Sequence, residues 1–314
     1  MIRAAKFTHR IGLGVLLCLV VIASAGSKRV AAQVRGVYPL GMSATNSGVT
    51  PAAGFTYSNQ LLIYSRGKFK GPQGETLATG NQSVVMDLNS IVWVSDKRIL
   101  GGARFSMSAT LPVANNSLSS DITGPVSGGS GFADSYYQPF ILGWDKQRVA
   151  VRAVYGFLAP TGSFTVGAND NVGSGYWTHA FSSGQTVYLT KNRKTSFSAF
   201  QMYEVHTTQE GTNIHPGQNL DLDYSLTHSV SLSKGSQLQF GLVGYNQWQT
   251  TDKTGPTITP QQAAAHYKVN ALGAGSNIVV EKLNLTAGFK YFKEFSNRST
   301  FEGYSVQFSA AIHF

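Results

Sequence analysis

The chain has 314 residues, and only 13% of them are charged, which is about half the share usual in soluble proteins. Its formal net charge is +10, but five of the 25 basic residues and no acidic residue precede Gln33, which leaves 20 basic against 15 acidic residues, or +5, from there on. Such a mild balance without basic blocks gives no support to nucleic-acid binding.

The first predicted element is a secretory signal peptide over residues 1–32. A basic start is followed by an uncharged apolar run over 11–25, and small residues offer cleavage sites after Ala25 or Ala32. The run is too short to span a membrane as a helix, and no second apolar run follows it as a stop-transfer signal. The single cysteine, Cys18, lies inside this run, so we expect a mature chain without thiol or disulfide chemistry.

Residues 33–54 are rich in Gly, Pro, Ser and Thr and are expected to form either a periplasmic leader or a small plug. From residue 55 to residue 314 the chain repeats segments with period-2 character, each followed by a turn or loop. An even number of antiparallel strands is what a bacterial single-chain outer-membrane barrel requires. The twelve predicted strands are 55–66, 83–95, 103–113, 134–144, 147–159, 185–191, 195–206, 219–232, 236–250, 266–279, 282–295 and 301–314.

The clearest alternation runs over residues 220–232. Leucine, tyrosine and valine side chains share one face of this segment, whereas Asp221, Asp223 and several serine and threonine side chains share the other. A soluble β-sandwich would also alternate, but its polar face would look outward and would usually carry more Lys and Glu. The apolar face here therefore favours contact with lipid.

The predicted connections alternate in length. Those after even-numbered strands are short, at 96–102, 145–146, 192–194, 233–235 and 280–281. Those after odd-numbered strands are mostly long, at 67–82, 114–133, 160–184, 207–218 and 251–265, with a short last one near 296–299. Short periplasmic turns opposite long outer loops are typical of an outer-membrane barrel, whereas a sandwich or propeller gives no reason for this pattern.

The last predicted strand, 301–314, is apolar or aromatic at every second residue from Tyr304 and closes on Phe314. Bacterial outer-membrane barrels commonly finish on a strand of this kind. We expect a C-terminal assembly signal made of Tyr304, Phe308, Ile312 and Phe314, and we expect this strand to pair with the first one.

No constellation of residues in the sequence points to catalysis or to a metal. The seven histidines show no paired ligand spacing, and no Gly-x-Ser-x-Gly stands at a strand-to-helix turn, so we expect no enzyme activity, no cofactor and no metal site. Asp221-x-Asp223 could be a calcium pair or a pair of acid/base carboxylates, but the favoured interpretation is that it lines a lumen opposite basic residues. The charged residues predicted to line the lumen and to select solutes there are Arg148, Arg152, Asp221, Asp223, Lys268 and Lys290.

Two stretches of the chain resemble a known family. Residues 156–162 (GFLAPTG) followed by residues 171–177 (NVGSGYW) look like the Pro-x-Gly then Asn-x-Gly…Trp signature of the transporter-like family named for the putative meta-pathway of phenol degradation. Residues 38–41 (YPLG) and 48–54 (GVTPAAG) are similar to the leader of its members. The resemblance implies an outer-membrane barrel associated with uptake of aromatic or other hydrophobic compounds, and it carries over no substrate residues.

Together these features predict an all-β protein, an antiparallel transmembrane β-barrel of about 12 strands over 55–314, after a cleaved signal peptide, in the outer membrane of a Gram-negative-type bacterium. The favoured function is a passive channel for small, hydrophobic or aromatic organic compounds, because twelve strands suit a narrow or loop-obstructed conduit and no nucleotide-binding motif is present. The alternatives are a non-transporting binding or structural barrel and a soluble exported β-protein. The expected partners are outer-membrane lipid, small organic solutes and the outer-membrane assembly machinery.

Overall fold

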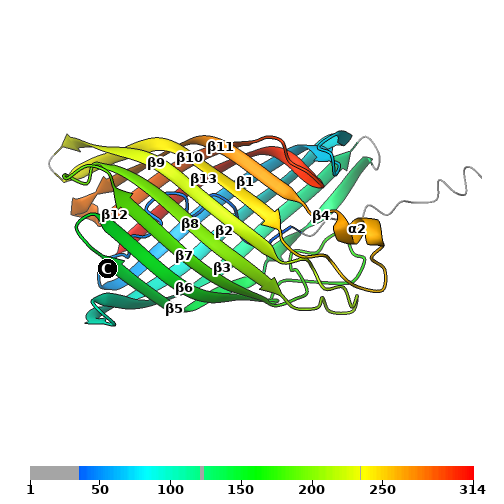
Figure 1. The fold of residues 1–314 in the computed structure, drawn as a ribbon, viewed down its shortest axis with the longest axis horizontal. Helices are drawn as coiled ribbons and strands as arrows, with labels where there is room; N and C mark the ends of the chain where they lie inside the picture. Colours follow the sequence, from blue (N-terminus) through cyan, green and yellow to red (C-terminus); the bar gives the residue numbers. More distant parts are fainter. Residues whose placement is uncertain (1–34, 121–123, 234) are drawn as a thin grey trace, which may run out of the picture. The chain divides into compact units, whose positions relative to one another are not determined.

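The computed structural model describes residues 35–120, 124–233 and 235–314, so the predicted signal peptide over 1–32 lies outside the described residues. They form a closed, antiparallel barrel (Figure 1), which confirms the predicted all-β fold class. Of the thirteen strands in the sheet, β4 (Gly124–Phe132) stays out of the ring because it pairs with β3 alone, which leaves twelve barrel strands. These are β1 (Gly54–Lys70), β2 (Thr76–Ile99), β3 (Ala103–Ser120), β5 (Ser135–Asp145), β6 (Val149–Ala159), β7 (Thr178–Tyr188), β8 (Thr195–His206), β9 (Asn219–Ser233), β10 (Ser236–Gln249), β11 (Lys268–Val280), β12 (Leu285–Glu294) and β13 (Thr300–His313).

Helical structure is confined to two short elements in connections, α2 (Pro260–Ala264) and the 3₁₀ turn η1 (Glu281–Leu283), within the part of the chain that the structure describes. A capping box starts α2: Thr259 accepts from the main-chain N–H of Gln262, and the Gln262 side chain accepts from the N–H of Thr259. Among the described residues, no helix is long and apolar enough to cross a membrane.

The ring closes between the first strand and the last. β1 pairs antiparallel with β13, with Leu61 opposite Phe308, and on its other side it pairs with β2. The main-chain N–H of Phe314 donates to the carbonyl of Phe55 at 2.8 Å, one pair beyond the end of β13. Closure pairs both edges of the sheet, which is what a sheet needs inside hydrocarbon.

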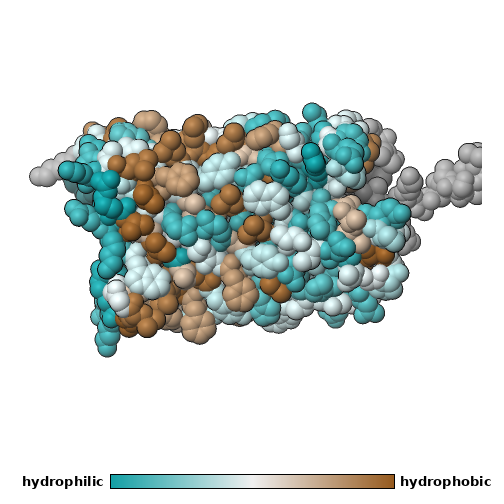
Figure 2. Space-filling model, viewed as in Figure 1, coloured by the Kyte–Doolittle hydropathy of each residue, from teal (hydrophilic) through white to brown (hydrophobic). Residues whose placement is uncertain are grey.

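The two faces of the wall have opposite character, as β13 shows. Tyr304, Phe308 and Ile312 point outward and are between 40% and 46% exposed, whereas Ser305 and Gln307 point inward and are buried. Figure 2 shows apolar side chains in brown over the half of the barrel that carries the C-terminus, while the end near α2 is mostly teal. The closed barrel and its apolar outer belt place the protein in an outer membrane.

Three of the five connections predicted to be long are long, and they lie at one end of the barrel. At the end of the barrel that carries the C-terminus, residues 100–102 join β2 to β3 and residues 146–148 join β5 to β6. At the other end, residues 160–177, 207–218 and 250–267 form long connections. This is the arrangement of periplasmic turns opposite outer loops.

Three predicted boundaries are wrong. Residues 67–82 are not a loop, because β1 and β2 continue on either side of a turn at 71–75. Residues 114–133 are not a loop either, because β3 continues to Ser120 and pairs with β4. The sixth barrel strand, β7, begins at Thr178 and not at residue 185.

The first two of these errors share one physical cause. Where strands project beyond the lipid belt, both faces meet water, so the apolar-polar alternation that marks a strand is lost. The error in β7 has a different cause. Its run Ser182-Ser183-Gly184-Gln185-Thr186 has small and polar residues on both faces, so the apolar-polar alternation cannot be seen although the strand crosses the belt.

Candidate functional site

The barrel interior holds a segment of its own chain, residues 35–53, which we call the lumen segment (Figure 1). It begins beside the β12–β13 connection, where Arg35 Nε donates to Thr300 Oγ1 at 2.6 Å. It ends where β1 starts at Gly54, close to the main-chain oxygen of Phe314. The segment forms no helix and no strand, so its main-chain polar groups depend largely on the wall for partners.

Glu204 on β8 holds the first residues of the lumen segment. Its buried carboxylate accepts the main-chain N–H groups of Val37 and Tyr38, at 3.0 and 2.7 Å, and the side-chain amide of Asn219 at 3.0 Å. A Cβ on Gly36 would stand 2.5 Å from the same carboxylate, so a larger residue there would have to displace hydrogen-bonded side chains. Charge-assisted bonds are about twice as strong as neutral ones, so this carboxylate orders the segment.

Asp223 on β9 holds the next turn. One oxygen accepts the N–H of Gly41 at 2.9 Å, and the other accepts the N–H of Ser43 at 3.0 Å and the hydroxyl of Tyr38 at 2.6 Å. Burial, reinforced by the neighbouring Asp223 carboxylate, raises the pKa of Tyr38 well above its ordinary value, so this hydroxyl stays a donor. Both oxygens of Asp223 are thus engaged by the lumen segment, whereas a calcium pair with Asp221 would need them free.

Two cations of the wall bind carbonyl groups of the same segment. Lys290 Nζ on β12 donates to the carbonyls of Gly41 and Met42, at 2.8 and 2.7 Å. Arg152 Nε on β6 donates to the carbonyl of Ser47 at 2.8 Å. Side chains of the wall therefore pair with both N–H and carbonyl groups of the lumen segment, whose main chain forms no β-sheet hydrogen bonds.

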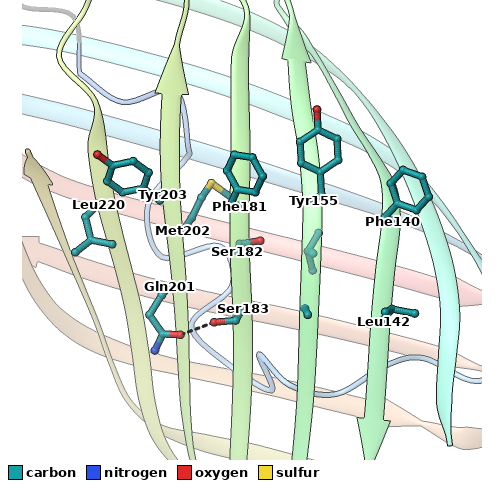
Figure 3. A pocket seen from close by; sticks show the side chains of 12 residues that line it. Phe140, Leu142, Tyr155, Phe181, Ser182, Ser183, Gln201, Met202, Tyr203 and Leu220 are labelled. Carbon is teal, nitrogen blue, oxygen red and sulfur yellow. Dashed lines mark hydrogen bonds between the residues drawn. The ribbon is translucent and has the colours of Figure 1, made fainter. Parts of the chain in front are cut away.

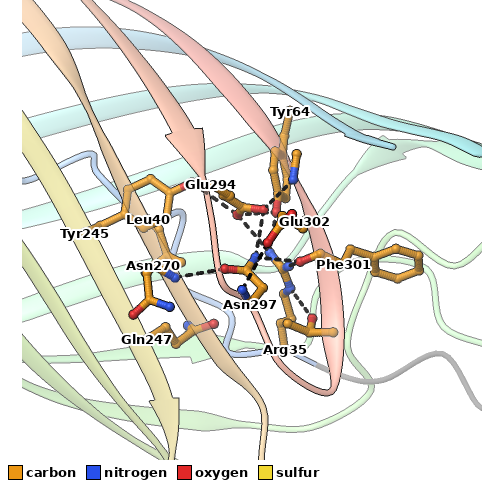
Figure 4. A network of polar contacts seen from close by, with 12 residues as sticks. Arg35, Leu40, Tyr64, Tyr245, Gln247, Asn270, Glu294, Asn297, Phe301 and Glu302 are labelled. Carbon is orange, nitrogen blue, oxygen red and sulfur yellow. Dashed lines mark hydrogen bonds and ion pairs between the residues drawn. The ribbon is translucent and has the colours of Figure 1, made fainter. Parts of the chain in front are cut away.

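Figure 4 shows a third cluster, at the start of the lumen segment, around the buried carboxylate of Glu294 at the end of β12. One oxygen accepts from Arg35 at 3.4 Å, from the hydroxyl of Tyr245 at 3.2 Å and from the hydroxyl of Tyr64. The other oxygen accepts from Asn297 Nδ2 at 3.1 Å. A single carboxylate thus joins β1, β10, the β12–β13 connection and the lumen segment.

Apolar contacts also hold the lumen segment in place. The ring of Tyr38 lies 5.4 Å from the ring of Phe200 and packs on a cluster that includes Met202. Leu40 packs against a second cluster that includes Phe292. The segment is therefore fixed by burial as well as by hydrogen bonds.

Of the six charged residues predicted to line the lumen, the structure places four inside the barrel: Arg152, Asp221, Asp223 and Lys290. Asp221 is buried beside Gln247, whose side-chain Nε2 donates to it at 2.7 Å. The lumen segment thus contacts three of the four directly, while Asp221 bonds the wall.

The other two predicted residues, Arg148 and Lys268, lie at strand ends and are exposed. The guanidinium of Arg148 donates to the carbonyl of Leu189 in the neighbouring turn at 3.2 Å. Lys268 is the first residue of β11, and its main chain pairs with Arg298. The structure does not bring these two side chains to the four in the lumen.

Three functional residues were missed from the sequence: Arg35, Glu204 and Glu294. Glu204 lies in the predicted strand 195–206 on the same face as Ser198, so the alternation alone could have placed it inward. No such signal exists for Arg35, because residues 35–53 show no regular alternation of polar and apolar residues from which the direction of a side chain could be predicted.

The inward-facing side chains differ in character around the lumen. Buried carboxylates gather on β8, β9 and β12, where they hold the lumen segment. On β1, β2 and β5, by contrast, Leu62, Leu88 and Ile141 face inward and are between 4% and 8% exposed. These apolar side chains stand among polar inward residues, such as Thr56 and Gln60 on β1.

Lys290→Met is expected to loosen the middle of the lumen segment. The substitution removes two charge-assisted hydrogen bonds, each worth about 1.5–3 kcal/mol, from the carbonyls of Gly41 and Met42. In a Ser43→Cys background we expect the rate of maleimide labelling to rise by about tenfold or more, since about 1.4 kcal/mol changes an opening equilibrium tenfold. Cys18 is the only native cysteine, so the reporter is unique in residues 33–314.

The matched control for this experiment is Lys293→Met, which removes a cation from the outward, exposed face of the same strand. Equal labelling rates in the Lys290→Met and Lys293→Met proteins would show that Lys290 does not hold the segment.

The family described as "Putative MetA-pathway of phenol degradation" matches residues 66–310. Among solved structures, the chain is similar to an outer membrane channel from Pseudomonas putida F1, with 11% sequence identity and a TM-score of 0.67, over 86% of this chain and 98% of that chain. It is also similar to the β domain of the Bordetella autotransporter BrkA, with 12% identity and a TM-score of 0.52, over 84% of this chain and 100% of that chain. No curated protein sequence matches. At these identities the two structures show a shared fold.

Proposed function

The chain belongs to the family described as "Putative MetA-pathway of phenol degradation", and from this premise we propose that it is a passive channel for uptake of small, hydrophobic or aromatic organic compounds. The protein is a channel-like outer-membrane barrel. The family's description names the degradation of an aromatic compound, and the similar protein from Pseudomonas putida F1 is an outer membrane channel. Both descriptions support uptake.

The observation that carries this proposal is a set of apolar side chains on the inner wall. Leu62, Leu88 and Ile141 face the lumen, which also holds the lumen segment. Polar solutes would have to give up water to pass beside these side chains, whereas apolar solutes gain by leaving water. These side chains thus favour solutes that carry an apolar ring over sugars.

We further propose that the lumen segment is a plug, which is one of the two forms expected for residues 33–54. It contacts the wall from the β12–β13 connection to the start of β1. Many of its contacts are hydrogen bonds that water can replace, and each contributes a net free energy of about 0.5–3 kcal/mol. Thermal displacement of part of the segment is therefore compatible with passive flux.

The outward row of β13 fits the other proposed partners, lipid and the outer-membrane assembly machinery. Tyr304, Phe308, Ile312 and Phe314 share this face and are all exposed. An exposed apolar row suits contact with lipid, and we propose that the same row is the assembly signal.

The segment inside the lumen also favours a second candidate, a barrel that binds or stabilises without transport. A plug held by the buried carboxylates of Glu204, Asp223 and Glu294 could keep the lumen closed permanently. Flux measurements separate the two functions.

The test is solute entry into liposomes that contain the purified barrel. We expect benzoate to enter faster than into protein-free liposomes and glucose to enter more slowly than benzoate, because benzoate has an apolar ring to place against Leu62, Leu88 and Ile141, whereas glucose is polar all round. Phenol needs comparison with protein-free liposomes, since it also crosses lipid unaided. If benzoate, phenol and glucose all fail to enter above the protein-free background, the channel proposal is overturned and the non-transporting barrel is favoured.

A further inference from the structure

The inner wall carries a row of arginine side chains at the periplasmic end of the lumen. Arg98 on β2 and Arg104 on β3 flank the short 100–102 connection and pair directly with each other. On its other side Arg104 pairs with Gly143 on β5, which pairs in turn with Arg152 on β6. Directly paired residues point to the same face of a sheet, and Arg152 reaches Ser47 of the lumen segment. This arginine row (Arg98, Arg104 and Arg152) therefore faces inward.

The arginine row has no carboxylate partner among the residues that the structure describes. Arg98 donates to the carbonyl of Gly102 at 2.9 Å, and Arg104 makes a long contact with the carbonyl of Pro51 at 3.5 Å. The Nε of Arg104 is buried and unpaired within 35–120, 124–233 and 235–314. Arg152 uses only its Nε, so both of its terminal NH₂ groups are free in the described part of the chain. Most N–H groups of this row thus lack an acceptor there.

The two carboxylates on the neighbouring stretches of β2 and β5 do not neutralise the row. Asp145 at the end of β5 is bonded to Arg193 at 2.9 Å. Asp96 on β2 is exposed and forms no ion pair with a described residue. Like charges that stand directly opposite each other destabilise a sheet, and Arg98 and Arg104 stand in this way. The uncompensated cations therefore call for an anion from outside the chain.

A free hydroxyl group lies within the row. Thr50 of the lumen segment covers Gly143, where its Oγ1 takes the space that a Cβ would need. This oxygen is buried and has no hydrogen-bond partner among the residues described. Gly143 stands between Arg104 and Arg152, so the hydroxyl lies between the two arginine-bearing strands and is able to donate to an anion held there.

Only a molecule inside the lumen can reach the arginine row. The outward face of β5, β6 and β7 is largely apolar and carries a groove of about 510 Å³ edged by the rings of Phe140, Tyr155 and Phe181 (Figure 3). The sheet thus separates the row from lipid headgroups. Inside the barrel, the next inward residue to Gly143 on β5 is Ile141, which is 4% exposed. A ligand at the row therefore meets guanidinium groups beside an apolar side chain.

We propose that the arginine row binds a carboxylate group, and that the solutes of this barrel are organic acids with an apolar body. A guanidinium presents paired N–H donors that fit the two oxygens of a carboxylate, and such charge-assisted bonds are about twice as strong as neutral ones. The carboxylate accepts from Arg104 and Arg152, and the apolar body packs against Ile141. Rings of arginine or lysine select anions in pores. The inference rests on the proposed function, whose solute class it narrows.

The test compares 4,4-difluorocyclohexanecarboxylate with 4,4-difluorocyclohexanemethanol, which has a neutral hydroxymethyl group in place of the carboxylate. Each probe is titrated at neutral pH into phosphatidylcholine nanodiscs with and without the full barrel, and binding is measured by broadening of its fluorine NMR line. We expect the barrel to broaden the carboxylate line more than protein-free discs do, and to affect the alcohol no more than protein-free discs. In the double variant Arg104→Gln/Arg152→Gln we expect the affinity for the carboxylate to fall about tenfold or more, the effect of losing one charge-assisted hydrogen bond.

Folding of the double variant is checked by heat-modifiable gel mobility, because Arg152 also holds the lumen segment. If the double variant does not fold, Arg104→Gln alone is tested, since Arg104 makes only one long contact. The matched control is Arg298→Gln, which removes the same charge from an exposed position in the β12–β13 connection, at the other end of the barrel. We expect its affinity for the carboxylate to equal that of the unmodified protein.

Four outcomes would overturn the proposal. Equal broadening of both probes would mean that the charge is not recognised. An unchanged affinity in the folded arginine variant would place the ligand elsewhere, and an equal loss in Arg298→Gln would mean that only net charge matters. Full displacement of the carboxylate by an equal concentration of inorganic phosphate would mean that the row takes any anion and needs no apolar body. The measurement detects occupancy and not passage, so a failure of liposome flux would overturn the proposed function alone.

Discussion

Removal of residues 36–50 is expected to convert the barrel into an open pore. This stretch runs through the lumen and is held there by Glu204, Asp223 and Lys290. A barrel of eight strands is filled by its own side chains, and one of twelve is wider, so an interior freed of the segment should admit water and ions. In planar bilayers we expect the single-channel conductance to rise by roughly an order of magnitude over that of the intact protein.

A double variant, Glu204→Gln/Asp223→Asn, tests the clamp without shortening the chain. Each substitution turns one carboxylate oxygen that accepts a main-chain N–H into an NH₂ group that repels it, so we expect brief openings to the conductance of the deletion variant. Leu242→Ala, an exposed outward position on β10, is the control and should behave as the intact protein. A folded deletion variant with the conductance of the intact protein would show that the segment does not obstruct the pore.

The alternation in the sequence was sufficient to predict the barrel but not its full height. In β13, Phe308 points outward to lipid and Gln307 points inward to the lumen, so the polarity of each residue indicates the direction of its side chain. In the parts of β1 and β2 beyond Arg66 and Ser83 the apolar-polar alternation is weak, although the backbone still forms strands. Strand length beyond the lipid is therefore set by main-chain pairing, which the hydrophobic pattern does not encode.

The site was predictable to the same extent and for the same reason. Asp223 could be placed inward because it alternates with leucine and tyrosine on β9. Its partner could not be predicted, because Gly41 lies 182 residues away and bonds through its main chain, which every residue type shares. Gly36 can be read from the sequence, but its close approach to the Glu204 carboxylate exists only in the folded barrel.

Glu294→Ala is expected to weaken the loop end of the barrel and to free the start of the lumen segment. The carboxylate accepts from Arg35, Tyr64, Tyr245 and Asn297, and also from the main-chain N–H of Gly303 at 2.8 Å. The substitution leaves these donors without their acceptor and leaves a buried guanidinium without its counter-charge. Loss of one partner from a buried pair costs about 3–5 kcal/mol, so we expect a clear fall in the temperature at which gel mobility changes.

Arg35→Met is the informative comparison. It removes the charge, but Glu294 keeps the donors Tyr64, Tyr245 and Asn297, so the loss of stability should be much smaller than in Glu294→Ala. Because the double variant Arg35→Met/Glu294→Ala contains no stranded Arg35 charge, it should be more stable than Glu294→Ala alone. If Glu294→Ala and Arg35→Met lower the transition temperature equally and additively, Glu294 acts only through packing. A double variant that recovers stability would instead show that the unpaired guanidinium, and not the missing side-chain volume, causes the loss.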